Sequence, residues 1–194
     1  CAAGCWQQAA SLWNIAIAEG IVTPMTYYYL GWCLHQGGLS GVKQAFADAV
    51  KACPDYCFPN RLEAILALQC AMVQNSDDAR APYYLGNLYY DKRQYDLAME
   101  AWETSARLDG SFPTVWRNLA LAFFNKKNEE AKAIECMERA FRLDTTDARI
   151  LMELDQLYKR VRRSHKERLA FLQQYPELIK QRDDLILEEI TLLN

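Results

Sequence analysis

One pattern occurs twice in this chain: residues 81–109 read APYYLGNLYYDKRQYDLAMEAWETSARLD, and residues 115–144 read VWRNLALAFFNKKNEEAKAIECMERAFRLD. Small and bulky side chains recur about 34 residues apart in the first half of each copy, and one residue further apart in the second half. The second copy therefore carries a one-residue insertion, which lies near Lys127. The apolar spacing within each copy is that of two amphipathic helices. The corresponding pairs are Leu85 and Leu119, Gly86 and Ala120, Ala98 and Ala133, and Trp102 and Met137.

This double pattern resembles the tetratricopeptide repeat (TPR) family. The resemblance implies helical hairpins that stack, each covering an apolar face of the next. Gly31, Gly86 and Ala120 are expected to be small because a larger side chain would push the paired helices apart. We therefore predict an all-α fold, a right-handed α-solenoid of TPR-like helical hairpins that is irregular around residues 54–76 and after residue 163. No segment shows the alternation of a strand.

We expect residues 1–194 to form a single solenoid, which extends outward from the double pattern in both directions. Residues 56–58 are too few to form a first helix before the helix at 59–75, so two helices of the second type should follow each other. The expected parts are complete repeats at about 23–55, 79–112 and 113–146, single second-type helices at 6–18 and 59–75, and degenerate C-terminal helices over 147–194.

Local signals indicate where several helices begin. Thr23 is expected to cap a helix with Pro24 at its first position, and Ser40 to cap the next helix. Pro59 is expected to start a helix, and Thr146 to cap the helix that follows the second regular repeat.

Asp155 departs from the repeat pattern because it stands where Gly86 and Ala120 stand in the preceding repeats. A carboxylate buried there needs a partner, since an unpaired one costs several kcal/mol of desolvation. Arg117 and Arg149 are the candidates, and the alternative is that Asp155 is exposed because the stack loosens.

Composition excludes some classes of function. The formal charge is −3, whereas a general nucleic-acid binder needs a basic surface, so nucleic acid is an unlikely partner. Apolar runs are shorter than the roughly 18 residues needed to cross a bilayer, so no membrane association is expected.

Seven cysteines are scattered through the helical stretches, which fits a reducing compartment and predicts a cytoplasmic protein. Cys1, Cys5, Cys53 and Cys57 could in principle supply four thiolates to zinc. Because each pair should lie along a helix or at its end, we predict no metal and no other cofactor. Cys1 could instead be lipidated, but a helix already begins at Trp6, which favours a boundary inside a longer protein.

Catalytic machinery is not evident, so this chain is predicted not to be an enzyme. Its two histidines, His35 and His165, suggest no pair, and no metal-protease, phosphate-loop or serine-elbow motif is present. The densest charge feature is a basic run, which a helix C-terminus would favour and which could alternatively dock an acidic partner. It consists of Lys159, Arg160, Arg162, Arg163, Lys166 and Arg168.

In TPR proteins the first helices line a concave groove that accepts a peptide or a helix. Exposed aromatic residues beside amides and arginines suit such recognition, and packing against neighbouring helices is the alternative for the aromatic rings. Carried over to this sequence, the groove-binding residues are Tyr28, Trp32, Tyr83, Asn87, Tyr90, Arg117, Asn118, Phe124, Arg149 and Gln156.

The family's clamp for a terminal carboxylate matches this chain only in part. Asn87, Asn118 and Arg149 occupy three of its places. Tyr83 stands where a lysine belongs, and Glu153, where a basic residue belongs, would repel a carboxylate.

A narrower resemblance rests on CFPNRLE (57–63), ARAPYYLGN (79–87), WRNL (116–119), ELDQLY (153–158) and RDDL (182–185). Together these segments are similar to the C-terminal helical region of large bacterial proteins with an N-terminal β-sandwich of the galactose-mutarotase-like kind. The resemblance implies a fragment of a cytoplasmic, carbohydrate-related protein, in which Asp155 belongs to the subfamily's own pattern.

These observations favour a non-catalytic scaffold for protein interaction or for contact between domains. Its expected partner is a protein or peptide segment, or another domain of the same polypeptide, and a homodimer is possible. The alternative function is a helical region that helps to complete a carbohydrate-binding or carbohydrate-processing site with a β-sandwich domain. The sequence does not identify the ligand.

Overall fold

The computed structural model describes residues 4–54 and 56–193, and every regular element within them is helical. The all-α fold class expected from the sequence is confirmed. The chain divides into two compact units, an N-terminal unit (Cys1–Gly110) and a C-terminal unit (Ser111–Asn194), whose boundary lies between the two regular repeats.

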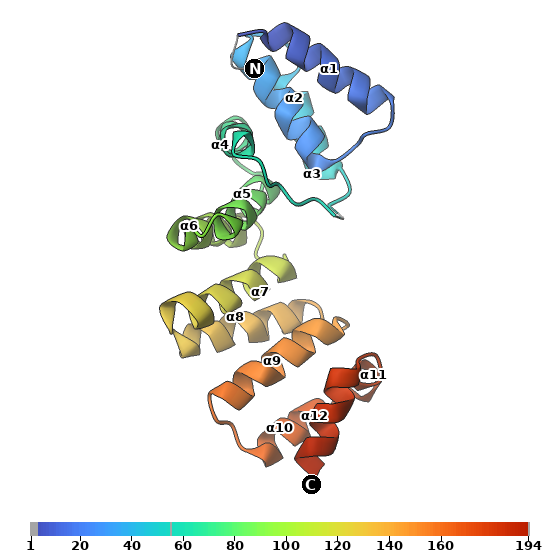
Figure 1. The fold of residues 1–194 in the computed structure, drawn as a ribbon, viewed down its shortest axis with the longest axis vertical. Coiled ribbons are helices and arrows are strands. Elements are labelled where there is room, and N and C mark those ends of the chain that lie inside the picture. Colours follow the sequence, from blue (N-terminus) through green and yellow to red (C-terminus); the bar gives the residue numbers. More distant parts are fainter. Residues whose placement is uncertain (1–3, 55, 194) are drawn as a thin grey trace. The chain divides into compact units, whose positions relative to one another are not determined.

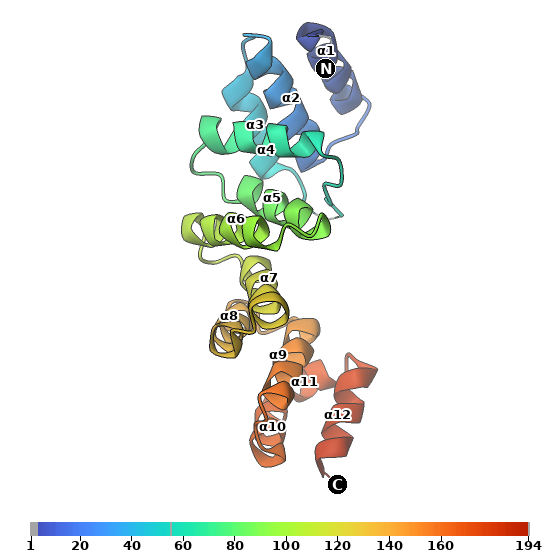
Figure 2. The same cartoon turned by 60° about the vertical axis from the view of Figure 1, so that its left-hand side comes forward.

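The N-terminal unit contains six helices in its described residues (Figures 1 and 2). The helices α2 and α3 lie side by side as one antiparallel hairpin and α5 and α6 as another, while α4 packs against both α2 and α5. The elements are α1 (Trp6–Ala18), α2 (Pro24–Gln36), α3 (Val42–Lys51), α4 (Glu63–Gln74), α5 (Arg80–Asp91) and α6 (Tyr95–Leu108).

The C-terminal unit contains the second regular hairpin, formed by α7 and α8, against which α9 packs. Three shorter helices follow, and α12 packs against α10 and α11. The elements are α7 (Pro113–Ala122), a π-helical turn η1 (Phe123–Lys127), α8 (Glu130–Leu143), α9 (Ala148–Arg160), α10 (His165–Leu172), α11 (Pro176–Ile179) and α12 (Asp183–Leu193).

Close helix approach explains the small residues of the repeat. A Cβ atom placed on Gly86 would lie 2.5 Å from the indole of Trp102, and one placed on Gly31 would lie 2.5 Å from the ring of Phe46. Ala120 is likewise fully buried. In each hairpin of the N-terminal unit, an aromatic ring from the second helix thus fills the space that the glycine of the first helix leaves open.

The one-residue insertion of the second copy is confirmed as the π-helical turn η1, which extends α7 through Lys127. A π-turn accommodates one extra residue without breaking the helix. The turn ends at Asn128, which adopts a left-handed conformation with φ 55°.

Helix starts follow the local signals only in part. The capping box between Thr23 and Thr26 confirms the start of α2. Ser40 does not cap α3, because Gly41 with φ 94° occupies the capping position. Thr146 was the wrong cap for α9, since the carboxylate of Asp147 accepts the bonds from the first backbone N–H groups. The start at Pro59 was also wrong, because residues 59–62 form the link into α4.

A buried polar contact joins α2 to the start of α5. The Tyr28 hydroxyl donates to Asp78 Oδ2 at 2.8 Å. The other carboxylate oxygen of Asp78 accepts bonds from the backbone N–H groups of Arg80 and Ala81. Burial raises the pKa of Asp78, and the hydrogen bonds from Tyr28 and the two backbone groups oppose this rise.

Tyr28→Phe is expected to lower the free energy of unfolding of the N-terminal unit by about 1.5–3 kcal/mol, the range for a hydrogen bond to a charged group. The variant keeps the ring and removes one donor from a carboxylate that is only 2 % exposed. Urea denaturation measures the change, and Tyr27→Phe at a half-buried neighbour should stay within about 0.5 kcal/mol. Equal stabilities of the two variants would contradict the assigned role of this contact.

Asp155 is completely buried, but its expected partners were wrong. Arg168 donates to both of its carboxylate oxygens, from Nε at 3.0 Å and from Nη2 at 2.6 Å. Arg117 instead pairs with Glu153, and Arg149 lies 4.0 Å from Asp147. Arg168 belongs to the short helix α10, which contributes no repeat signature, so periodicity could not identify it.

Candidate protein-binding surfaces

A hollow of about 350 Å³ in the C-terminal unit gathers three of the residues expected to bind ligand, Phe124, Arg149 and Gln156. Phe124 comes from the turn η1, and the other two come from α9. The lining residues are Leu121, Phe124, Asn125, Arg149, Met152, Glu153, Gln156, Leu157, Arg160, Arg182 and Asp184.

The acidic and basic side chains of this hollow differ in how far they are already paired within the chain. Both of its carboxylates already have arginine partners: Glu153 pairs with Arg117 through two hydrogen bonds, and Asp184 pairs with Arg182 at 2.6 Å. Arg160 has its guanidinium 5.3 Å from the centroid of the Phe124 ring. The exposed cations of the hollow are therefore better placed than its carboxylates to meet a ligand of opposite charge.

The pairing of Glu153 with Arg117 changes the expectation that Glu153 repels an anion. Because the two groups form a bidentate pair, the negative charge of Glu153 is largely compensated. Asn118, on the same helix as Arg117, is half-buried and does not line the hollow.

In the N-terminal unit the expected groove residues do not form one surface. Tyr28 is fully buried and engaged by Asp78, so it cannot contact a ligand. The Asn87 side-chain oxygen accepts a bond from Trp102 Nε1 at 3.0 Å, and the Tyr90 ring lies 5.4 Å from that of Trp102. Tyr83 is half-buried, with its ring 5.2 Å from that of Tyr84. Packing within the hairpin therefore accounts for much of this aromatic cluster.

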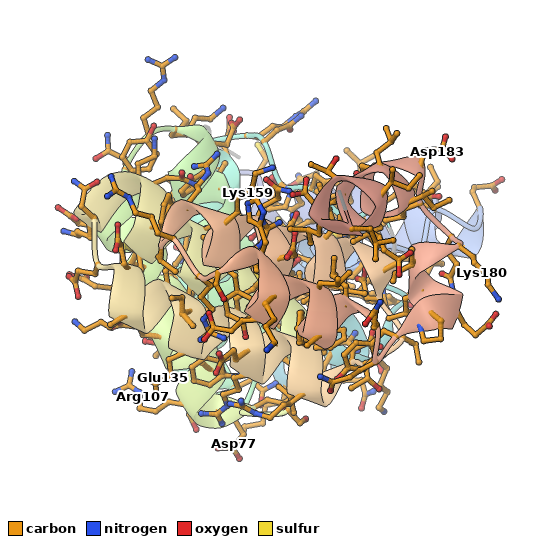
Figure 3. All side chains as sticks on the ribbon, turned by 90° about the horizontal axis from the view of Figure 1, so that it is seen from below. Asp77, Arg107, Glu135, Lys159, Lys180 and Asp183 are labelled. Carbon is orange, nitrogen blue, oxygen red and sulfur yellow. The ribbon has the colours of Figure 1, made fainter. Side chains whose placement is uncertain are left out.

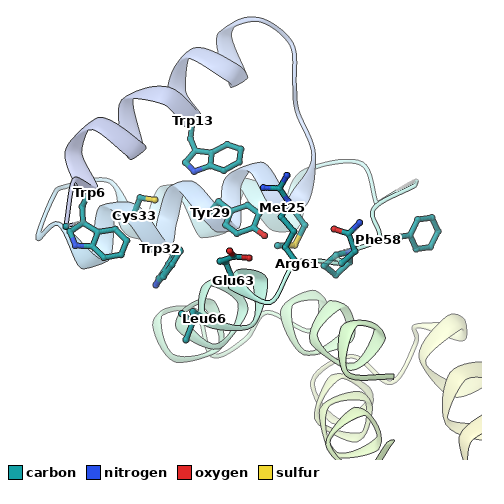
Figure 4. A pocket seen from close by; sticks show the side chains of 13 residues that line it. Trp6, Trp13, Met25, Tyr29, Trp32, Cys33, Phe58, Arg61, Glu63 and Leu66 are labelled. Atoms are coloured by element: carbon teal, nitrogen blue, oxygen red, sulfur yellow. The ribbon is translucent and has the colours of Figure 1, made fainter. Parts of the chain in front are cut away.

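Trp32 lines a separate and larger hollow of about 900 Å³ within the N-terminal unit (Figure 4). Four of the aromatic rings that line it come from α1 and α2. Trp13 stacks on Tyr29 with ring centroids 5.1 Å apart, and Trp6 meets Trp32 edge-on at 5.3 Å.

Some residues of the two hollows carry little signal in the sequence. Arg160 belongs there only to the basic run, and Arg182 only to the segment RDDL (182–185) of the narrower resemblance. Asn125 could have been found from the insertion near Lys127, because the π-turn shifts the direction of the side chains it contains.

The basic run is divided among different contacts. Arg168 is buried, Lys159 donates to Glu188 at 2.8 Å, and Arg163 lies 3.7 Å from the centroid of the Tyr158 ring and also pairs with Glu138. Charged side chains elsewhere, such as Glu135 and Lys180, project from the surface of the C-terminal unit (Figure 3). The run is thus partly structural.

Residues that could support catalysis or metal binding are dispersed. Within residues 4–54 and 56–193, no three histidine, cysteine or acidic side chains come together as a metal site. Cys1, one member of the possible zinc set, lies outside these residues. His35 and His165 are exposed and belong to different units. No helix in the described part of the chain is long and apolar enough to span a membrane.

Comparison with known proteins supports the repeat assignment. Residues 83–148 match the model of the tetratricopeptide repeat family. This match covers most of α5 and all of α6, α7 and α8, the two regular hairpins.

Solved structures of TPR proteins share the fold over nearly the whole chain. YrrB, described as a TPR protein with an unusual peptide-binding site, has a TM-score of 0.57 at 18% identity, covering 95% of this chain and 83% of that chain. MamA from Desulfovibrio magneticus RS-1 has a TM-score of 0.54 at 18% identity, with 92% and 88% covered. The C-terminal part of a TPR repeat-containing protein from Cytophaga hutchinsonii has a TM-score of 0.54 at 16% identity, with 95% and 63% covered. The chain is therefore similar in fold to helical TPR solenoids.

Proposed function

We propose that this chain is a non-catalytic protein-interaction scaffold that binds a protein or peptide segment in the hollow of the C-terminal unit. The observation that carries the proposal is the convergence of Phe124, Arg149 and Gln156 with Arg160 in that hollow. The partner is another protein or another domain of the same polypeptide.

The chemistry of the hollow favours a segment with an apolar side chain beside an acidic one. Leu121, Phe124 and Met152 supply apolar surface, and Arg149 and Arg160 supply exposed positive charge. Arginine combines charge with planar stacking surface, which suits interface recognition. The peptide-binding site named for the structurally similar YrrB supports a peptide as the ligand.

Arg160→Glu is expected to weaken binding of a selected peptide at least about tenfold, because the variant replaces attraction by repulsion at the hollow. The probe is a display library of random peptides of about 12 residues, selected on the wild-type chain and measured by calorimetry. Wild-type affinity should also fall as salt is raised.

Lys166→Glu is the matched control, since it makes the same charge change at an exposed position outside the hollow. It should leave the affinity within about twofold of the wild type. Equal losses in the two variants would show that only the overall charge matters, and selection of no peptide at all would contradict the proposal.

A second candidate function is that the chain helps to complete a carbohydrate site together with a β-sandwich domain. The narrower sequence resemblance suggests it, and the half-buried rings of Tyr83 and Tyr90 offer aromatic surface of the kind that sugar rings contact. A panel of soluble glycans, applied to the polypeptide that contains this chain and the β-sandwich domain, with and without Tyr83→Ala, tests this candidate. Binding that this substitution abolishes would favour it, and indifference to all glycans would count against it.

A further inference from the structure

The large hollow of the N-terminal unit is a trough built from three helices. The helices α1 and α4 each pack against α2 and form its two walls, and α2 forms its floor (Figure 4). Trp13 extends into it from α1, Tyr29 and Trp32 from α2, and Leu66 belongs to the α4 wall. The lining is mostly aromatic and aliphatic, so the trough offers apolar contact area.

An apolar stripe formed by the N-cap residue Leu62 and two residues of α4 continues beyond this trough. Leu62 is 64%, Leu66 53% and Val73 77% exposed. Their spacing of four and seven residues places them on one face of the helix. Eleven residues of helix span about 16 Å, and Phe58, in the link before α4, adds a ring that is 74% exposed. A small molecule held in the trough would leave Val73 uncovered, so an elongated occupant fits this surface better.

The backbone of the trough selects a helix over an extended segment. The walls and floor are helices whose backbone N–H and C=O groups are already bonded within each helix. A strand lying in the trough would bury its own backbone groups with few partners, at a cost comparable to lost hydrogen bonds. An amphipathic helix satisfies its backbone internally and presents only side chains.

The negative charge of Glu63 at the trough favours an occupant that carries a basic residue. Glu63, in the first turn of α4, points toward Tyr29 (Figure 4) and has no ion-pair partner in the described part of the chain. Burial, and after it the charge of Glu63, raises the pKa of Tyr29, whereas the charge of Arg61 opposes this rise. The trough thus carries one charge of each sign, and Glu63 is the one placed on a wall beside the aromatic rings.

We infer that this trough is a docking site for an amphipathic helix of a protein partner. The partner's apolar face packs along Leu62, Leu66 and Val73, and one of its lysines or arginines pairs with Glu63. The site shares no residue with the hollow of the C-terminal unit, so it is independent of the function proposed above.

The test is a display library of peptides about 15 residues long, selected on the full chain. Every member has apolar residues with the spacing i, i+4, i+7 and i+11, and half of the members carry a central proline that prevents a helix. Helix-competent members should be enriched at least tenfold over proline-containing ones. The enriched sequences should share a lysine or arginine at one position relative to the apolar face.

Two variants and one control locate the site. Leu66→Asp should weaken the best peptide at least tenfold, whereas Leu97→Asp, at a similarly exposed leucine of α6, should leave its affinity unchanged. Glu63→Gln should remove the preference for the basic peptide over a version with glutamine at that position. Circular dichroism checks that each variant keeps its helices.

Several outcomes would overturn the inference. They are equal enrichment of the proline-containing members, no enrichment at all, an affinity that Leu66→Asp does not change, or a basic preference that survives Glu63→Gln. Self-association of the chain that Leu66→Asp abolishes would assign the trough to a second copy, and binding of a soluble glycan there would assign it to carbohydrate. Each of these results would also overturn the proposed occupant.

Discussion

Arg168→Ala is expected to lower the free energy of unfolding of the C-terminal unit by about 3–5 kcal/mol, the cost of removing one partner from a buried ion pair. Arg168 is 1% exposed and Asp155 is 0% exposed. The guanidinium donates to both oxygens of Asp155 and also to Glu188 at 2.6 Å. Its loss would leave a carboxylate buried without its charge partner, and would uncouple α9, α10 and α12.

Urea denaturation followed through Trp116, the tryptophan of the C-terminal unit, measures this change. A variant with both Asp155→Leu and Arg168→Met is the control, because replacing a buried pair by apolar groups of similar size is often neutral or stabilising. It should regain most of the stability that Arg168→Ala loses. A loss below about 1 kcal/mol in Arg168→Ala would show that the pair matters little.

The contribution of Glu188 to this network should depend on pH. Partial burial alone would raise the pKa of Glu188, but hydrogen bonds from Lys159 and Arg168 outweigh it and lower the pKa below the ordinary 4.5. A carboxyl group with a lowered pKa in the folded state stabilises the fold above its unfolded pKa, and this stabilisation is lost as the pH falls through the folded value. The stability of the wild type should therefore decline more steeply below about pH 4.5 than that of Arg168→Ala.

Trp102→Ala should destabilise the N-terminal unit by about 3–5 kcal/mol, the range for truncating a large buried aromatic residue. Trp102 is 3% exposed, and its ring lies against Gly86 with its Nε1 donating to Asn87. The truncation removes both the apolar contact and the hydrogen bond. Urea denaturation followed by circular dichroism measures the loss.

The effect of Gly86→Ala on the free energy of unfolding should change sign when Trp102 is replaced by alanine. In the wild type, Gly86→Ala would place its Cβ 2.5 Å from a rigid indole, and overpacking of this kind costs about 1–3 kcal/mol. In the Trp102→Ala background this clash is absent, so the gain of about 1 kcal/mol in helix propensity should remain. Destabilisation by Gly86→Ala of equal size in both backgrounds would show that the indole is not the reason for the glycine.

Sequence periodicity predicts the parts of this fold that neighbouring repeats share. Gly86 and Ala120 occupy equivalent positions because the two helices of each hairpin approach closely there. The π-turn lies where the second copy has its extra residue. Features that occur only once in the chain produce no sequence repeat, so periodicity cannot predict them. The Arg168 partner of Asp155 comes from a degenerate helix, and its identity depends on how α10 folds back onto α9.

The candidate binding surfaces were less predictable than the hairpins. Carrying over groove positions identified Phe124, Arg149 and Gln156, which share a hollow, but also Tyr28, which is buried. The helical period predicts which residues share one face of a helix. It does not predict how wide the gap is between that face and the neighbouring helix. In the N-terminal unit that gap depends on the irregular link before α4, whose course no repeat pattern determines.

The most direct test of the proposed interaction role is an amide NMR map of the ¹⁵N-labelled chain, titrated with the peptide selected on the wild-type chain whose binding Arg160→Glu weakens most. The largest shifts should fall on η1 and α9, at residues such as Phe124, Asn125 and Gln156. Shifts that are absent from this hollow, or that concentrate on α8, which contributes no residue to its lining, would contradict the proposed site.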